Sequence, residues 1–156
     1  MDPTAPGPEG RSEGTAGYSS APSQTGIPAA ADAAQLGRDF FLALDRRDPR
    51  RLRATLADHA SFRALPHQPP VRLADDIVAY FGGVVSSYPL ARWEVSDVIG
   101  EGDRAVVQFL IREPSDRWGR EVVSEQVAVV RTSQGQIVSI VGYYDSAEFR
   151  RAFWEE

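Results

Sequence analysis

The stretch REVVSEQVAVVRTSQGQIVSIVGYYD, residues 120–145, contains two long apolar segments separated by the polar turn TSQG. Both segments are rich in valine and isoleucine, which fit the pleated surface of a β-strand. A short turn between two such segments is typical of a β-hairpin. Residues 120–145 therefore predict two long antiparallel strands, around which the rest of the fold has to be arranged.

A second pair of strand-like segments precedes this hairpin. RWEVSDVI (92–99) and RAVVQFLIRE (104–113) are separated by the turn GEGD, and the loop PSDRWG leads into the hairpin at 120–145. Four consecutive strands joined by short turns are typical of an antiparallel meander.

Apolar side chains occupy both faces of this predicted sheet. Successive residues of a strand point to opposite faces. Both sets contain apolar residues: Val122, Ala128 and Val130 in one, Val123, Val127 and Val129 in the other. Because an antiparallel sheet in a small domain normally leaves one face to water, we expect helices to cover one face and a second copy of the chain to cover the other. The sequence thus predicts a homodimer.

Two helices are predicted at the start of the folded region. Asp32 and Gln35 resemble a capping box, and apolar residues then recur at helical spacing over about 33–47. Asp48 and Pro49 have the residue types of an N-cap and a first-turn proline, so they open a second helix. A short extended piece, ASFRAL, follows.

A third helix is predicted between Leu73 and Pro89, after the loop LPHQPP. Gly82 and Gly83 lie inside it, and each weakens a helix by up to about 1 kcal/mol relative to alanine. We therefore expect a bend or a close packing contact at these glycines. A short fourth helix is predicted directly after Asp145.

Composition excludes several classes of site and partner. The chain has no cysteine, which excludes disulfides, thiolate nucleophiles and zinc sites built from thiolates. Residues 1–31 hold five of the 11 prolines and five of the 13 glycines, so we expect a disordered tail before a domain at 32–156. The net charge of -5 argues against a nucleic-acid partner. With neither a signal-like start nor a long apolar run, we expect a cytoplasmic protein without a membrane partner.

The order of these elements resembles a known family. The helix pair ending in LADHASF, the helix RLADDIVAYF, the hairpin VIGEGDRAVVQFLI, the hairpin at 120–145 and the closing helix carry the resemblance. Residues 32–153 are similar to a SnoaL-like domain of the nuclear transport factor 2-like, or ketosteroid isomerase-like, superfamily. The resemblance implies an α+β fold: a cone-shaped roll of three N-terminal helices packed in a strongly curved antiparallel β-sheet, with a short C-terminal helix.

The same resemblance implies a function and a central residue. It predicts a small cyclase or isomerase, without cofactor or metal, that acts on a hydrophobic polyketide-like intermediate in bacterial secondary metabolism such as antibiotic biosynthesis. Asp145 matches the acid/base aspartate of SnoaL-like cyclases at the end of the last strand. However, Asp145 and Glu148 also have capping-box spacing. Asp145 is therefore either an acid/base in an apolar pocket or only the cap of the last helix.

The register of the last hairpin decides which residues accompany Asp145. A three-residue loop at TSQG would pair Val129 with Ser139, Val127 with Val141, Glu125 with Tyr143 and Val123 with Asp145. Glu125, Tyr143 and Asp145 would then share one face. A two-residue loop would shift this register by one residue and separate Glu125 from Tyr143.

Further side chains are candidates for the site. Tyr143 or His59 could steady an oxyanion beside Asp145. The substrate-binding candidates are Glu125, Tyr80, Phe40, Trp118, His67, Val127 and Val141. Core or loop packing is the alternative for Trp118 and Tyr80, and a structural ion pair with Arg112 is the alternative for Glu125.

Departures from the family narrow the chemistry. Positions that carry the base, the tyrosine and the second aspartate of ketosteroid isomerases correspond here to Ala64, Phe40 and about Val127. Steroid isomerisation by that mechanism is therefore not expected. The Asp-Arg-Asp relay of limonene-type epoxide hydrolases finds no matching spacing. A non-catalytic binding or assembly module that uses the same cone remains the alternative function, because a fold alone does not imply activity.

Overall fold

A computed structural model describes residues 32–154 of the chain. The tail predicted at 1–31 lies outside the described residues. The elements follow in the order α1 (Ala33–Asp45), α2 (Pro49–Ala54), β1 (Leu56–Arg63), β2 (Val71–Arg72), α3 (Ala74–Ser87), β3 (Arg92–Glu101), β4 (Arg104–Ser115), β5 (Arg120–Ser133), β6 (Gln136–Tyr143) and α4 (Ser146–Phe153).

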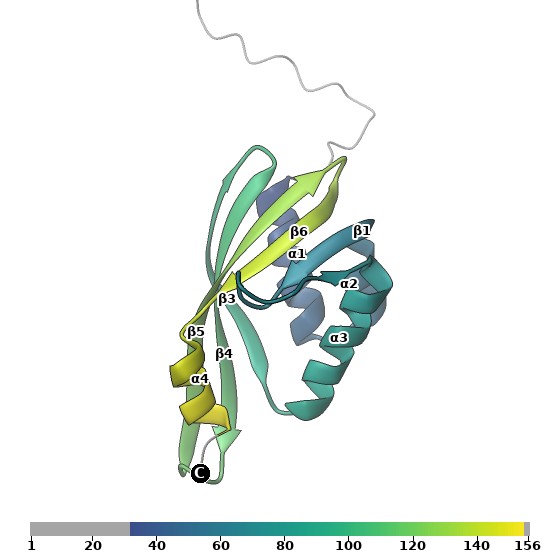
Figure 1. Ribbon diagram of the computed structural model, residues 1–156. Helices are drawn as coiled ribbons and strands as arrows, with labels where there is room; N and C mark the ends of the chain where they lie inside the picture. The colour runs from purple at the N-terminus through teal and green to yellow at the C-terminus, as the bar shows by residue number, and fades with distance from the viewer. Residues whose placement is uncertain (1–31, 155–156) are drawn as a thin grey trace, which may run out of the picture.

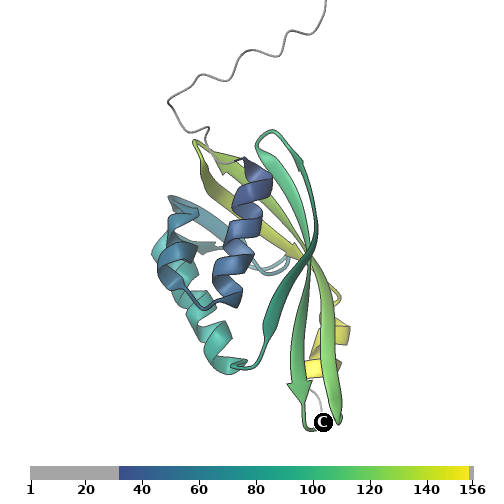
Figure 2. The ribbon, with the colours of Figure 1, turned by 180° about the vertical axis from the view of Figure 1, so that it is seen from behind.

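The fold is a curved sheet that holds three helices against one face, as predicted. The strand order is β2-β1-β6-β5-β4-β3. Figures 1 and 2 show α1, α2 and α3 together on one side, while α4 lies near the end of the β4–β5 hairpin. One detail differs from the prediction: β1 pairs in parallel with β6, so the sheet is not wholly antiparallel. Of the extended piece predicted at ASFRAL, residues 60–63 belong to the longer strand β1, whereas residues 64 and 65 lie beyond its end.

The first two helices begin where their capping residues predict. Asp32 accepts a hydrogen bond from the backbone N–H of Gln35 at 2.8 Å. Asp48 accepts one from the N–H of Arg51 at 3.0 Å, and Pro49 occupies the first turn of α2. Each cap satisfies an amide that the helix itself cannot pair. The helix starts could therefore be located from sequence.

Of the two turns considered for the last hairpin, the structure has the two-residue one. The turn contains two residues, Gln134 and Gly135, with φ values of 52° and 74°. Positive φ at both central positions is the geometry that a two-residue hairpin turn requires. A bulge then follows, since Arg131 pairs with Ser139 whereas Thr132 pairs with Ile137.

The bulge determines which side chains share a face. The two-residue turn shifts the pairing by one residue relative to a three-residue loop, and the bulge shifts it by one more. Val127 therefore pairs with Tyr143 and Val129 with Val141. Glu125 and Tyr143 therefore stay on one face, but they are not cross-strand partners. Without the bulge, every side chain of β6 would point to the opposite face.

The two faces of the sheet have different environments. In β5 the even-numbered residues Val122, Gln126, Ala128, Val130 and Thr132 are buried on the face that meets the helices. The opposite face, called here the outer face, exposes large apolar side chains on each of its four long strands. They are Ile99 on β3, Val106 on β4, Val123 on β5 and Tyr143 on β6. The prediction that both faces carry apolar residues thus agrees with the structure.

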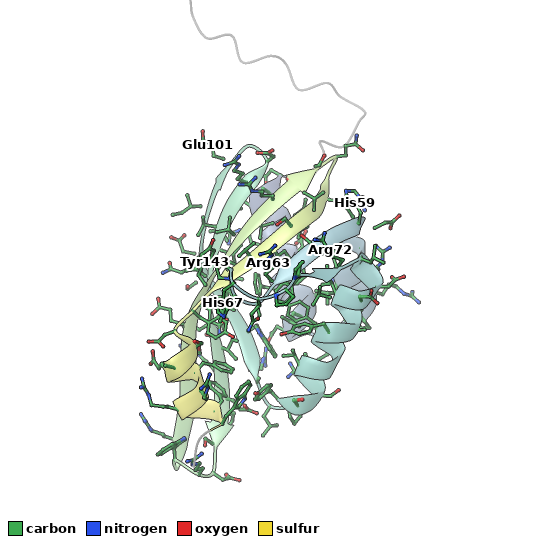
Figure 3. All side chains as sticks on the ribbon, in the orientation of Figure 1. His59, Arg63, His67, Arg72, Glu101 and Tyr143 are labelled. Atoms are coloured by element: carbon green, nitrogen blue, oxygen red, sulfur yellow. The ribbon has the colours of Figure 1, made fainter. Side chains whose placement is uncertain are left out.

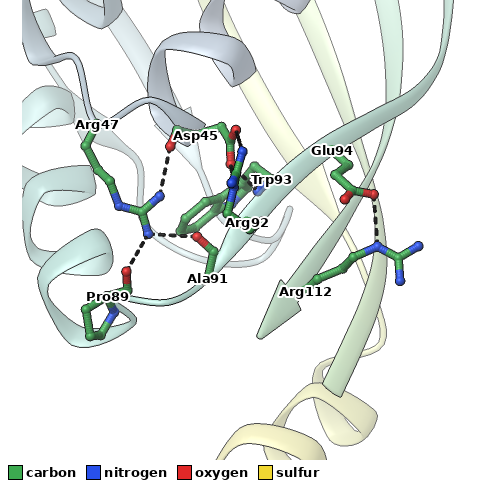
Figure 4. Close-up of polar contacts among 8 residues, drawn as sticks. All are labelled: Asp45, Arg47, Pro89, Ala91, Arg92, Trp93, Glu94 and Arg112. Carbon is green, nitrogen blue, oxygen red and sulfur yellow. Dashed lines mark hydrogen bonds and ion pairs between the residues drawn. The ribbon is translucent and has the colours of Figure 1, made fainter. Parts of the chain in front are cut away.

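A polar cluster ties the end of α1 to the start of β3 (Figure 4). The carboxylate of Asp45 accepts hydrogen bonds from Arg92 at 2.9 and 2.8 Å and from the backbone N–H of Trp93 at 2.9 Å. Arg47 donates to the carbonyls of Tyr88, Pro89 and Ala91, and its guanidinium lies 5.6 Å from the centre of the Trp93 ring. The cluster fixes the α3–β3 connection against the helices.

Other long-range contacts differ from expectation. Arg112 forms ion pairs with Glu94 and Glu121, both at 2.9 Å, rather than with Glu125. An added Cβ at Gly82 or Gly83 would have no neighbour within 4 Å, so the close packing predicted at these glycines is absent. A different glycine is tightly packed: a Cβ at Gly142 would lie 2.4 Å from the carbonyl oxygen of Ala64.

We expect Gly142→Ala to lower the free energy of unfolding by about 1–3 kcal/mol, because the new methyl group would force two backbones apart. Gly83→Ala is the matched control. It should raise that free energy by about 0.5–1 kcal/mol, since the helix gains propensity without a clash. Urea unfolding followed by circular dichroism measures both changes. Equal stability of the two variants would contradict this account of the β6 contact.

The ion pair of Asp45 should make stability depend on pH. Burial raises the pKa of this carboxyl, but the hydrogen bonds from Arg92 and Trp93 outweigh burial and lower the pKa overall. A lowered folded-state pKa adds stability above the unfolded value of about 3.9, and this stability is lost as pH falls through the folded pKa. Asp45→Asn should therefore cost roughly 1–2 kcal/mol at pH 7. The difference from wild type should shrink below about pH 4 in urea titrations. A difference that stays constant with pH would contradict the assignment.

Candidate functional site

A cavity of ≈ 240 Å³ lies between the helices, the inner face of the sheet and α4. Eleven of its 20 lining residues are phenylalanine, tyrosine or tryptophan, and none carries a formal charge. Such walls suit a hydrophobic, partly aromatic molecule, because polar ligands would lose hydration without gaining partners.

The deep wall of the cavity is a cluster of stacked aromatic rings. Phe41 of α1 and Phe109 of β4 have ring centres 4.2 Å apart. The ring centre of Phe81 in α3 lies 5.4 Å from that of Phe40 and 4.8 Å from that of Phe62 in β1. Rings at these separations are mutually attractive. Phe40 and Phe41 of α1 also contact each other, so these rings form one connected aromatic cluster in the cavity wall.

Three tyrosines, Tyr80, Tyr88 and Tyr144, form a phenol cluster in the cavity wall. Burial raises the pKa of Tyr80, and the neighbouring Tyr88 raises it further. The pKa of Tyr144 is raised mainly by burial and also by Tyr80 and Tyr88. Because a raised pKa favours the neutral phenol, the hydroxyls of Tyr80 and Tyr144 stay protonated at neutral pH and can act as hydrogen-bond donors.

The polar contribution to the wall is small. Gln126 of β5 is 9% exposed, and its side-chain amide donates to the hydroxyl of Ser124 at 3.1 Å. Gln68, in the β1–β2 connection, is half-buried and also lines the cavity. These amides and the phenol cluster are the groups that could bind a ligand oxygen or nitrogen.

Helix α4 closes one side of the cavity through aromatic contacts. Phe149 and Trp154 line the cavity, and Phe149 stacks on Phe153 with ring centres 4.5 Å apart. Phe153 meets the ring of Tyr88 at 6.0 Å, and the indole N–H of Trp154 donates to the Tyr88 hydroxyl. No residue of α4 is fully buried. The helix therefore rests on the cavity mouth rather than in the core.

Asp145 lies outside the cavity lining. Its carboxylate accepts a hydrogen bond from the backbone N–H of Glu148 at 2.9 Å, and the residue is exposed. This is the geometry of an N-cap for α4. Of the two interpretations weighed from sequence, the structure places Asp145 as a cap.

Four further predicted residues lie on the outer face of the sheet. Glu125, Val127, Val141 and Tyr143 have the parity opposite to the cavity-lining Gln126, Ala128, Ile140 and Gly142, and Tyr143 is 48% exposed. The prediction that these four side chains point into the pocket is wrong, because in each strand the neighbouring residue is the one that faces inward. The same parity makes Tyr144, and not Tyr143, a cavity residue.

The two histidines and Trp118 also lie away from the cavity lining. His59 on β1 and His67 in the β1–β2 connection are both exposed. Figure 3 shows His59 well apart from Tyr143. The indole of Trp118 donates to the backbone carbonyl of Ala152 at 3.2 Å, beneath the guanidinium of Arg117. Trp118 therefore holds α4 from outside rather than covering a ligand.

Phe40 and Tyr80 are the two predicted site residues that line the cavity. Tyr88, Phe149 and Trp154 also line the cavity, although none of them was among the predicted site residues. Two features of the sequence could have indicated them: the aromatic residues of the closing helix, and a tyrosine directly before Pro89, which ends the third helix. Among the positions that depart from ketosteroid isomerases, Ala64 and Phe40 line the cavity, whereas Val127 lies on the outer face.

Comparison with solved structures places this architecture among known folds. An NTF2-like protein of unknown function from Burkholderia pseudomallei is 24% identical, with a TM-score of 0.67 over 80% of this chain and 99% of that one. A candidate polyketide cyclase from Pseudomonas putida is 16% identical, with a TM-score of 0.62 over 78% and 98% of the two chains. A ketosteroid isomerase-like protein from Catenulispora acidiphila, in complex with trimethylamine, is 11% identical, with a TM-score of 0.64 over 76% and 91%.

No curated protein matches the chain. Within residues 32–154, no helix has the length and apolarity that crossing a membrane demands. The family model of the SnoaL-like domain matches residues 38–140, a range that begins within α1 and ends within β6. Together with the curved sheet and its three enclosed helices, this match shows that the chain belongs to the SnoaL-like domain family, within the NTF2-like and ketosteroid isomerase-like fold.

Proposed function

We propose that the cavity binds a hydrophobic, polyketide-like molecule with a carbonyl group, and that the protein is a cyclase or isomerase without a cofactor. The observation that carries this proposal is the pairing of aromatic walls with a phenol cluster in a site that no charged residue lines. The SnoaL-like family and the candidate polyketide cyclase of the same fold support it.

The phenol cluster supplies the chemistry in this proposal. A hydroxyl of Tyr80, Tyr88 or Tyr144 donates a hydrogen bond to the ligand's carbonyl oxygen. This bond strengthens as the oxygen gains negative charge on the way to an enolate. Low local polarity increases the effect because little water competes for the oxygen. The aromatic walls add a second contribution, since they confine a flexible chain to few conformations.

Asp145 has no acid/base role in this proposal. Its carboxylate is engaged with the amide of Glu148 and lies outside the cavity lining. The capping function alone accounts for an aspartate at this position, because it satisfies an amide that the first turn of α4 leaves unpaired.

A binding module without chemistry is the second candidate function. The uncharged cavity lining favours it, because proton transfer usually relies on a group that ionises near the operating pH. Both candidates require ligand binding in the cavity, and only the enzyme requires that a bound ketone lose a proton faster than it does in water.

Ligand binding should depend on Tyr144 and not on its neighbour. We expect 2-tetralone, a small bicyclic ketone, to quench tryptophan fluorescence because Trp93 and Trp154 line the cavity. Tyr144→Phe should weaken its binding about 5–10-fold, the effect of losing one hydrogen bond of about 1 kcal/mol. Tyr143→Phe, which changes the same group on the outer face, should leave the affinity unchanged. Equal affinities of the two variants, or no quenching of the wild type, would contradict the proposed site.

We also propose that the protein forms a homodimer through the outer face. Ile99, Val106, Val123 and Tyr143 expose apolar area across four neighbouring strands. On the same face Leu110, Val127, Val129 and Val141 are half-buried, while Glu125 is exposed. A second copy of the chain carries the same surface, so a two-fold axis would bring the two apolar faces together. Burying this area would remove it from water on both chains.

The outer face should therefore control the oligomeric state. Val106→Glu places a charge within the proposed interface, so we expect the sedimentation coefficient to change from that of a dimer to that of a monomer. Leu90→Glu is the matched control, because Leu90 is 62% exposed in the α3–β3 connection and lies away from the outer face. A monomeric wild type, or a Val106→Glu variant that remains dimeric, would refute the interface.

A further inference from the structure

One carboxylate lies on the inner face of the sheet next to the cavity. Along β4, Ala105, Val107 and Phe109 are buried on that face, and Ile111 lines the cavity. Glu113 is the next residue with the same parity. It therefore points to the cavity side of the sheet, about 7 Å beyond Ile111 along the strand. The residue is half-buried.

The surroundings of Glu113 leave its oxygens available. No other residue within the described range 32–154 forms a hydrogen bond or ion pair with this carboxylate. Its cross-strand partner is Val122, which is 9% exposed and apolar. By contrast, the nearby Glu94 and Glu121 on the outer face are both paired with Arg112. Glu113 is thus a carboxylate that the fold partly removes from water without a partner that holds it.

Arg47 is the charged group whose field reaches Glu113. Its guanidinium is already occupied by the backbone carbonyls of Asp45, Tyr88, Pro89 and Ala91. Arg47 therefore limits the cost of an ionised Glu113 without covering the carboxylate. Burial raises the pKa of Glu113, and Arg47 partly opposes this rise. A carboxylate with a raised pKa is a stronger base than one in water.

We propose that Glu113 is the proton-accepting group of this site, a role that rests on the proposed binding of a ketone in the cavity. The bond between a proton and the carbon next to the carbonyl breaks, and the proton forms an O–H bond with the Glu113 carboxylate. The electron pair moves to the carbonyl oxygen, where a hydroxyl of the phenol cluster donates a hydrogen bond to the enolate. Glu113 then returns the proton to a carbon of the same molecule, which completes an isomerisation without any other reactant.

The phenol cluster and Glu113 can take different roles because one is protonated and the other ionised. Phenols whose pKa is raised stay protonated and can donate a hydrogen bond to the enolate oxygen, whereas a carboxylate can accept a proton once it has lost its own. The enolate forms beside the donors, and the proton leaves toward the solvent-accessible end of β4. The two groups therefore stabilise opposite ends of the same electron movement.

Deuterium exchange of 2-tetralone tests this role directly. The protons at C1 of this ketone exchange through the enol, and ¹H NMR in D₂O follows their loss. We expect the wild type to accelerate exchange well above the buffer rate. Glu113→Gln should lose this acceleration at least 100-fold, the usual contribution of a general base. Glu113→Asp should retain part of it. Glu121→Gln, the matched control on the outer face, should exchange like the wild type.

The outcomes separate this inference from the proposed function. If 2-tetralone quenches wild-type fluorescence but exchanges at the buffer rate, the cavity binds ketones and the role of Glu113 is refuted. The same conclusion follows if Glu113→Gln exchanges like the wild type. If 2-tetralone does not bind, the proposed function fails together with this inference. Thermal melting of both Glu113 variants, and their binding of 2-tetralone, show whether a lost rate reflects a lost base or a lost fold.

Discussion

The alternation of side chains along β4 and β5 is the constraint on which the rest of the structure depends. One set of residues forms the wall of the cavity and packs against the helices, and the other set forms the outer face. Because side chains alternate between the two faces, the face of every residue in a strand follows once the face of one residue is known. The close approach of α1 anchors this choice, since a Cβ at Gly37 would lie only 2.7 Å from a methyl group of Val107. That contact holds the helix against the inner face and leaves the outer face open.

The parts of the fold that depend on neighbouring residues could be predicted from sequence. The caps at Asp32 and Asp48, the helix ending before Pro89 and the four long strands all result from local chemistry, and the structure has them where they were expected. The register of the last hairpin did not follow, because it depends on a bulge opposite Arg131 that no local pattern marks. The parallel pairing of β1 with β6 joins segments about 80 residues apart, so it too could not be deduced from local periodicity.

The candidate site was harder to predict than the fold. The resemblance to cyclases made Asp145 the candidate acid/base, but the same residue has the spacing of a helix cap. Sequence alone could not decide between a cap and a residue of the pocket. The cavity instead depends on contacts between distant segments, such as Tyr88 with Trp154 and Phe41 with Phe109. Glu113 illustrates the difficulty. Its position after Ile111 in an apolar alternation is visible in the sequence. Its partial burial, and the absence of an ion-pair partner among residues 32–154, are properties of the assembled sheet.

The attachment of α4 has a consequence for how the cavity exchanges its contents. The helix has no fully buried residue, and it is joined to the rest of the chain by ring contacts and by two indole hydrogen bonds. Segments with so few interior contacts open locally at a much lower free energy than the whole molecule unfolds. Opening of α4 would uncover the aromatic wall of the cavity while the strands remain paired. For a ligand bound as proposed, the dissociation rate should then follow the opening of this one short helix and not the stability of the sheet.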